Sequence, residues 1–254
     1  MMQELFVKSS IDGSSQPVLF HACSEANRPL LVGLHTWSFD RFNQVDNMLP
    51  YAREHNWNLL LPEFRGPNLP GNPHCQDACG SKLAKQDVFD AIAYVVEHYE
   101  IDTDQIYLLG LSGGGHMALL AAAMHPEVFK AVAAFVPISG LKSWHDDDGM
   151  YVEALEACLG GPPDEAHIKE YRKRSPMHFI SRLAKVNLKI FHGKYDPVVS
   201  VTQSVKLYEK ISKKFPQSRV FLDVFDGGHE MSMDAAFTWF LSQMHKQELT
   251  QVSG

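Results

Sequence analysis

The stretch Gly110-Leu111-Ser112-Gly113-Gly114-Gly115 contains a serine whose neighbours could make it a nucleophile. The apolar run 106–109 predicts a buried strand before it, and the helix-forming residues 116–124 predict a helix after it. A serine on a sharp strand-to-helix turn is strained, and glycines at 110 and 114 avoid a collision with the neighbouring backbone. Such a turn directs the Gly113 N–H and the helix N-terminus at a negative oxygen forming over Ser112.

A serine hydroxyl needs a neighbouring base, which is usually a histidine oriented by a carboxylate. Asp196 and His229 each follow a run that predicts a strand, 187–191 and 219–225 respectively. Asp223 and Asp226 compete for the carboxylate role, but Asp223 lies within the strand pattern and Asp226 is too close in sequence to His229. We therefore predict a catalytic triad of Ser112, Asp196 and His229 that uses no metal ion and no cofactor.

The elements that must position these residues alternate between apolar runs and helical patterns, which predicts an α/β fold with a mostly parallel sheet and helices on both faces. Two strands at 3–9 and 17–23 predict an N-terminal hairpin, and the irregular or helical segment 141–185 predicts a short insert that acts as a small lid. Ser200 and Gln203 have the spacing of a capping box. The length suits a single domain over residues 1–254.

Three blocks of the sequence resemble the α/β-hydrolases, and more narrowly the catalytic domain of the prolyl oligopeptidase family and its esterase relatives. The run from Ser112 to Leu119 is similar to the family's nucleophile block, His192-Gly193 with Asp196 and Val199 to its acid block, and Gly228-His229 to its histidine block. The resemblance extends from about Leu30 to Met244. It implies the order Ser, Asp, His along the chain and a covalent acyl-enzyme.

The resemblance also implies a second donor to the oxyanion from the turn after the first central strand, here His35-Thr36-Trp37-Ser38. We expect the Trp37 N–H to join that of Gly113, with the Thr36 N–H second, although Thr36 stands where the family usually has glycine.

Four residues near the predicted cleft are candidates for substrate binding: His35, Glu63, Arg65 and Trp144. Arg65 could bind a substrate carboxylate or hydroxyls, or form a salt bridge that orders the Pro/Gly-rich loop 62–80. Trp144 could stack on a sugar or an acyl group, or pack the insert onto the domain.

The formal net charge of −7 disfavours nucleic acid or an anionic membrane as the main partner. No long uncharged apolar run or signal peptide is visible, so we expect a cytoplasmic protein unless a leader was removed. Cys75 and Cys79 could pair in an oxidising compartment, and otherwise they are reduced thiols.

The sequence therefore predicts a serine hydrolase, and a short chain with a small insert favours a carboxylesterase or deacylase for small or carbohydrate-linked acyl esters. A peptidase of prolyl oligopeptidase type acting on short peptides is the alternative. A non-catalytic binding protein with the same fold is the third hypothesis. The oligomeric state stays open.

Overall fold

The computed structural model describes residues 2–147 and 149–251, which fold around one eight-stranded sheet. The strands follow the order β1-β2-β4-β3-β5-β6-β7-β8 across the sheet. β1 and β2 pair antiparallel, as do β2 and β4, and every other neighbouring pair is parallel. The strands are β1 (Gln3–Lys8), β2 (Ser15–His21), β3 (Arg28–Leu34), β4 (Asn58–Pro62), β5 (Ile101–Leu111), β6 (Ala131–Phe135), β7 (Leu188–Gly193) and β8 (Val220–Phe225).

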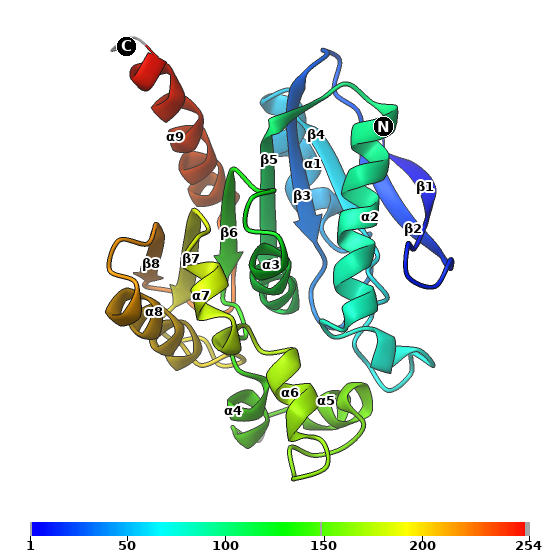
Figure 1. Cartoon of the computed structure of the whole chain (residues 1–254), viewed down its shortest axis with the longest axis vertical. Helices are drawn as coiled ribbons and strands as arrows, with labels where there is room; N and C mark the ends of the chain where they lie inside the picture. The colour runs from blue at the N-terminus through cyan, green and yellow to red at the C-terminus, as the bar shows by residue number, and fades with distance from the viewer. Residues whose placement is uncertain (1, 148, 252–254) are drawn as a thin grey trace.

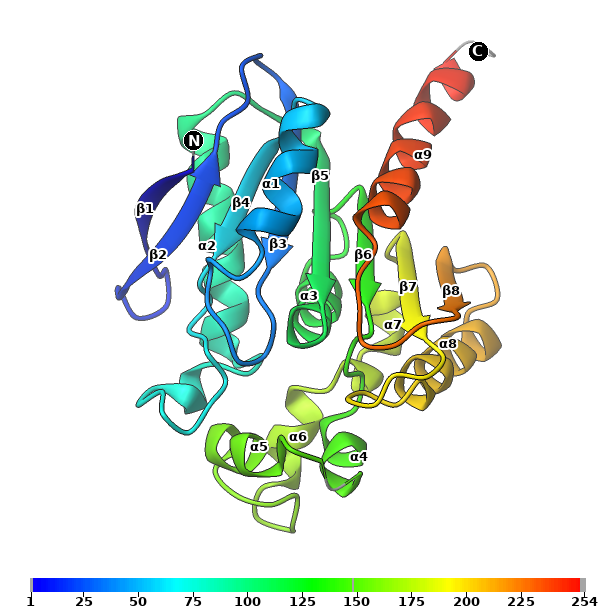
Figure 2. The same ribbon diagram turned by 180° about the vertical axis from the view of Figure 1, so that it is seen from behind.

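Helices cover both faces of this sheet. α2 (Lys82–His98), α3 (Gly113–Met124) and α8 (Thr202–Lys214) lie on the face turned to the viewer in Figure 1. α1 (Val45–Glu54) and α9 (Met233–Gln251) lie on the opposite face, which Figure 2 shows. The mostly parallel α/β-hydrolase architecture predicted from the sequence is confirmed, as is its N-terminal hairpin.

Each face of the sheet buries its own apolar layer. Val88 and Val95 of α2 pack with Leu119 of α3 on one face, while Met48 of α1 and Phe240 of α9 pack on the other. The central parallel strands are covered on both sides and therefore read as continuous apolar runs in the sequence. Their burial fixes the strand ends from which the loops of the site emerge.

The predicted insert lies beyond the carboxyl ends of the parallel strands, at the bottom of Figures 1 and 2. It contains α4 (Leu141–Asp146), α5 (Val152–Leu159), α6 (Ile168–Lys173) and α7 (Ile180–Leu183), with short 3-10 turns η1 (Cys75–Asp77) in the facing loop and η2 (Pro176–His178) before α7. A third apolar cluster, which includes Leu155 and Tyr171, joins the insert to the rest of the molecule.

The capping box predicted at Ser200 and Gln203 is wrong. α8 begins after Val201 with no side-chain cap, and the Ser200 hydroxyl instead lies 3.0 Å from that of Thr202. The Gln203 side chain is buried, where its Oε1 accepts hydrogen bonds from the N–H groups of Ser139 and Gly140. A long-range contact has therefore displaced the local one.

All four cysteines are free, so Cys75 and Cys79 do not form a disulfide in this structure. Among the described residues, no helix is both long and apolar enough to traverse a lipid bilayer.

Candidate active site

Ser112 lies on a strained turn between β5 and α3. Its backbone has φ 57° and ψ −117°, a conformation that residues other than glycine rarely adopt. A Cβ added at Gly110 would lie 2.1 Å from the carbonyl oxygen of Gly114, and one at Gly114 would lie 2.4 Å from that of Leu34. Glycine is therefore required at both positions, because the turn brings backbone against backbone.

The backbone of Trp37 lies directly beside this turn. A Cβ added at Gly113 would be 2.5 Å from the Trp37 nitrogen, so the two N–H groups border the same space. Neither N–H has a hydrogen-bond partner among the described residues. The Thr36 carbonyl, which belongs to the same peptide as the Trp37 N–H, lies 2.9 Å from Nδ1 of His35, and this contact orients the peptide. The pair can therefore donate to an oxyanion over Ser112.

The Thr36 N–H is not available as the second donor that the sequence suggested. It donates to the Asn43 side-chain oxygen at 3.1 Å. Asn43 was not a candidate, because an asparagine in a polar loop carries no signal of such a role. This contact occupies the Thr36 N–H, so Trp37 and Gly113 remain as the open donors among the described residues.

Asp196 and His229 meet at the carboxyl ends of β7 and β8. Nδ1 of His229 lies 2.8 Å from Oδ2 of Asp196, whose side chain is fully buried. The other carboxylate oxygen accepts the N–H groups of Val198 and Val199, both at 2.8 Å. An aspartate that bonds the backbone two and three residues later is a common turn device, and the sequence Asp-Pro-Val-Val is compatible with it.

These contacts determine the charge state of Asp196. Burial alone would raise its pKa, but the hydrogen bonds from His229, Val199 and Val198 prevail and lower it below the ordinary value. The carboxylate is therefore ionised at neutral pH, and it holds the proton of His229 on Nδ1. This arrangement leaves the lone pair on Nε2 of His229 to accept a proton.

Ser112 is almost buried, and its hydroxyl forms no hydrogen bond with any of the residues that the structure describes. The bond between Ser112 and His229 that catalysis requires is therefore not formed in this state. Hydrogen bonds of this kind are often long in the absence of substrate and tighten when it binds.

A second histidine, His192, supports the loop that contains Asp196. His192 is fully buried, with Nε2 2.8 Å from the Val199 carbonyl and Nδ1 2.7 Å from the Ser204 hydroxyl. Because a carbonyl can only accept, Nε2 carries the proton and Nδ1 accepts from Ser204. Burial lowers the pKa of His192, so it stays neutral beside Asp196.

The other candidates for substrate binding have structural partners. His35 is buried, and its ring nitrogens lie 2.9 and 2.6 Å from the carbonyl oxygens of Thr36 and Glu63. Oε2 of Glu63 pairs with Arg41 at 2.8 Å. Both ring nitrogens of His35 and one carboxylate oxygen of Glu63 are therefore engaged within the protein.

Arg65 forms the salt bridge that was the alternative to substrate binding. Its guanidinium pairs with Asp87 at 2.6 Å and with Asp12 at 2.7 Å, and it also donates to Ser9 and Ser14. This network joins the loop after β4 to α2 and to the β1–β2 turn. The expectation that Arg65 binds substrate is not supported by its contacts.

Trp144 packs the insert onto the domain, as the second interpretation had it. Its ring meets that of Trp37 edge-on with centroids 5.0 Å apart, and the Tyr151 ring lies 5.0 Å from Trp144 and 6.2 Å from Trp37. Its indole N–H donates to the Val198 carbonyl at 3.1 Å. Trp144 therefore packs the insert against both the Trp37 turn and the Asp196 loop.

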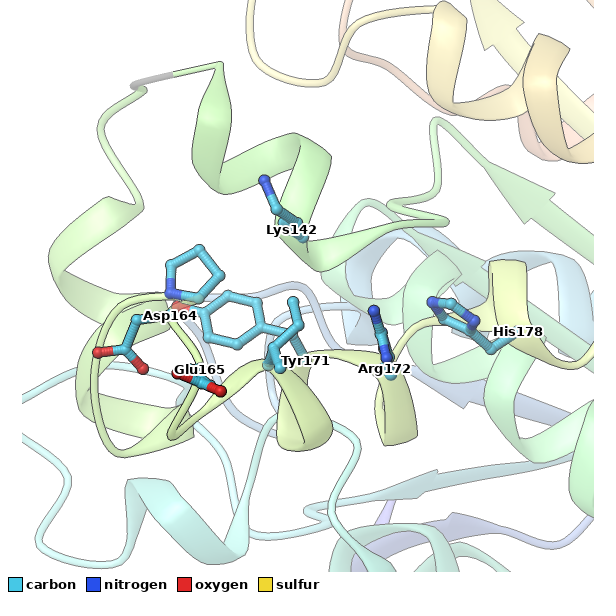
Figure 3. A pocket seen from close by; sticks show the side chains of 8 residues that line it. Lys142, Asp164, Glu165, Tyr171, Arg172 and His178 are labelled. Carbon is cyan, nitrogen blue, oxygen red and sulfur yellow. The ribbon is translucent and has the colours of Figure 1, made fainter.

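The insert also encloses a cavity of about 450 Å³, which Figure 3 shows. Lys142, Arg172 and His178 line one side of it, and Asp164 and Glu165 line the other. None of the predicted triad residues lines this cavity, so its volume is no guide to the reaction.

Comparisons with known proteins identify the family and the fold. The sequence profile of the prolyl oligopeptidase family matches residues 75–245. The chain is 24% identical to acylamino-acid-releasing enzyme 2 of Oryza sativa subsp. japonica over 83% of its own length and 29% of that protein. It is 26% identical to an acetylxylan esterase of Coprinopsis cinerea over 43% of its own length and 31% of that protein. The chain thus spans less than a third of either relative.

Among solved structures, the chain resembles the fluorophosphonate-binding serine hydrolase F of Staphylococcus aureus with a TM-score of 0.74 at 15% identity, over 94% of this chain and 98% of that one. This likeness extends the agreement to the whole fold. The profile match, which spans more than half of the chain, shows that the chain belongs to the prolyl oligopeptidase family of serine hydrolases, and its fold is that of the α/β-hydrolases.

Proposed function

We propose that this protein hydrolyses small acyl esters through an acyl-enzyme formed on Ser112. The observation that carries the proposal is the strained Ser112 turn beside the N–H groups of Trp37 and Gly113, for which the described part of the chain offers no acceptor. Strain of this kind is maintained only where the surrounding structure imposes it, and it is concentrated at functional sites.

In the proposed mechanism, Ser112 Oγ forms a bond to the acyl carbon while its proton passes to Nε2 of His229. The negative oxygen of the tetrahedral intermediate accepts the N–H groups of Trp37 and Gly113. His229 then gives its proton to the departing alkoxide as the C–O bond breaks. Water repeats the sequence on the acyl-enzyme, and Asp196 stabilises the imidazolium in both halves.

The choice of an ester over a peptide rests on charge. The charged residues that could bind the termini of a peptide, Glu63 and Arg65, are already paired within the protein. The aromatic rings packed beside the Ser112 turn, those of Trp37 and Trp144, are buried and offer no charged group. An uncharged ester with a short acyl group needs no charged partner, whereas a zwitterionic peptide does.

A peptidase acting on short peptides is the second candidate. It is supported by the acylamino-acid-releasing enzyme, because this relative covers more of the chain than the esterase does. Both reactions use the same acyl-enzyme, so the difference lies in the leaving group and its binding.

The test compares nitrophenyl acetate, longer acyl esters and aminoacyl anilides with wild-type protein and with Ser112→Ala. We expect the short esters to have the highest kcat/KM, and Ser112→Ala to lose at least about a thousandfold in kcat. A fluorophosphonate probe should label only the wild-type protein. Preferred turnover of the anilides would favour the peptidase, and equal labelling of Ser112→Ala would show that the nucleophile lies elsewhere.

A further inference from the structure

Two adjoining cavities of about 560 and 270 Å³ lie on the face of the molecule opposite α1 and α9, and both are lined by Lys85 and Phe179. The larger runs between the first turn of α2 and α6, and the smaller continues along α3. Figure 1 shows these helices on the front of the molecule, with the lower end of α2 near the insert. We call the combined space the basic groove. Its cationic residues are Lys82, Lys85, Lys173, Arg174 and Arg182.

The charge of the basic groove is opposite to that of the whole protein. The chain carries a formal net charge of −7, whereas only Asp77 and Glu170 offset the cations of the groove. Glu170 is already shared between Lys173 at 2.7 Å and Arg174 at 3.4 Å. The groove therefore concentrates positive charge that its own carboxylates do not neutralise, and it attracts anions.

Lys85 lies where the two cavities meet. It is half-buried, and its ammonium group makes no hydrogen bond or ion pair with the residues that the structure describes. Burial lowers the pKa of Lys85, and the nearby Arg174 guanidinium lowers it further. A half-buried ammonium with no partner is costly, and an anion in the groove would remove that cost.

Two neighbouring groups add positive potential beside Lys85. Arg174 contributes its charge, although its Nη1 already donates to the carbonyls of Gln76, Ala78 and Cys158 and its Nη2 to Glu170. The Ser81 hydroxyl accepts the Ala84 N–H, which leaves the Lys82 and Leu83 N–H groups of α2 without a partner among the described residues. Lys82, Leu83 and Lys85 line the same cavity, so the positive end of α2 and the Lys85 charge both act on it.

We propose that the basic groove binds a small molecule carrying a phosphoryl group, with its anionic oxygens between the Lys85 ammonium and the Lys82 and Leu83 N–H groups of α2. A phosphoryl dianion offers several acceptor oxygens and can therefore use the ammonium and the backbone donors together. The volume of the groove leaves room for the organic part of the molecule. This site is separate from Ser112, so the proposal does not depend on the proposed reaction.

The first experiment measures the affinity of the intact protein for inorganic phosphate and pyrophosphate by calorimetry, at ionic strength held constant with sodium chloride. Lys85→Gln should weaken the binding of pyrophosphate by at least about tenfold, as expected for the loss of a charge-assisted contact. Lys213→Gln, which removes an exposed charge on α8 outside the groove, is the matched control and should leave the affinity within about twofold.

The second experiment needs no variant. Limited acetylation of the wild-type protein with acetic anhydride, mapped by mass spectrometry, compares the modification rates of Lys85 and Lys213 with and without pyrophosphate. Bound anion should slow acetylation of Lys85 several-fold and leave Lys213 unchanged. The proposal would be overturned if pyrophosphate does not bind, if both variants bind it equally well, or if Lys85 is not protected.

Discussion

The two carboxylate oxygens of Asp196 have different partners, so one serves catalysis and the other serves the structure of the loop. Oδ2 faces His229, and Oδ1 accepts backbone N–H groups. We expect Asp196→Asn to lower kcat for nitrophenyl acetate by about 10⁴-fold, since the amide would favour the wrong tautomer of His229. The fold should stay intact by circular dichroism.

The matched control for this variant is Asp223→Asn, which removes the half-exposed carboxylate that competed with Asp196 in the sequence. This variant should keep kcat within a few-fold of the wild-type value. A larger loss of kcat in Asp223→Asn than in Asp196→Asn would indicate that Asp223 of β8 orients His229.

Asp196 also predicts a pH dependence of stability. Its pKa is lower in the folded protein than in the unfolded chain, where it is about 3.9. The ionised form therefore stabilises the fold above that pH, and the contribution is lost as the pH falls through the folded value. Urea unfolding at pH 6 and below pH 4 should show a free energy of unfolding that falls more steeply in wild type than in Asp196→Asn. Parallel decreases in the two proteins would contradict this assignment.

At the scale of elements, the junction of β5 and α3 tolerates almost no added volume. The Cβ of Gly110→Ala would lie 2.1 Å from a backbone oxygen, and neither strand nor helix can shift without losing buried contacts. We expect this variant to lose about 2–4 kcal/mol in the free energy of unfolding. Gly71→Ala is the control, because a Cβ there meets nothing within 4 Å, and equal stability losses in the two variants would refute the steric argument.

Elements with a strong local pattern could be predicted from the sequence. The strands β3, β4, β6 and β7 are short apolar runs, and the residues after Leu111 form the predicted turn and helix. β5 is longer than the predicted 106–109 because Ile101 pairs with Arg28 across an irregularity in the ladder. Such pairing depends on a distant strand, so no periodicity in residues 101–105 reveals it.

The site residues also divide into those with a local sequence pattern and those that depend on distant segments. Asp196 and His229 could be predicted because each follows a recognisable strand, and the structure brings them into contact. The partners of Thr36 and Arg65 could not, since they depend on how loops from separate parts of the chain meet. Sequence alone therefore left a charged residue such as Arg65 with both a structural and a functional interpretation.

At the scale of the whole molecule, Arg65 is a junction between three segments that are distant in sequence. Its guanidinium is almost buried and neutralises Asp87, whose side chain is only 1% exposed. Arg65→Gln would leave that carboxylate buried without a cation, so we expect a loss of about 3–5 kcal/mol in the free energy of unfolding. The KM of a small ester should change by less than about threefold at a temperature where the variant is folded, because the residue does not bind substrate.

Lys142→Gln is the control for this change, because it breaks the exposed pair with Asp146 and should cost less than about 1 kcal/mol. Denaturation of the three proteins in urea measures both effects. A large rise in KM with little loss of stability in Arg65→Gln would restore the substrate-binding interpretation.

The contacts of Arg174 have a consequence for how the molecule opens. One nitrogen of this side chain donates to carbonyls at Gln76, Ala78 and Cys158, so the loop after β4 is tied to α5 and α6. We expect these segments to exchange their amide hydrogens as one cooperative unit, at a lower opening free energy than β5. Arg174→Met should divide that unit into two parts with different exchange rates. The two segments that lie beyond the carboxyl ends of the parallel strands would then owe their joint stability to a single guanidinium group.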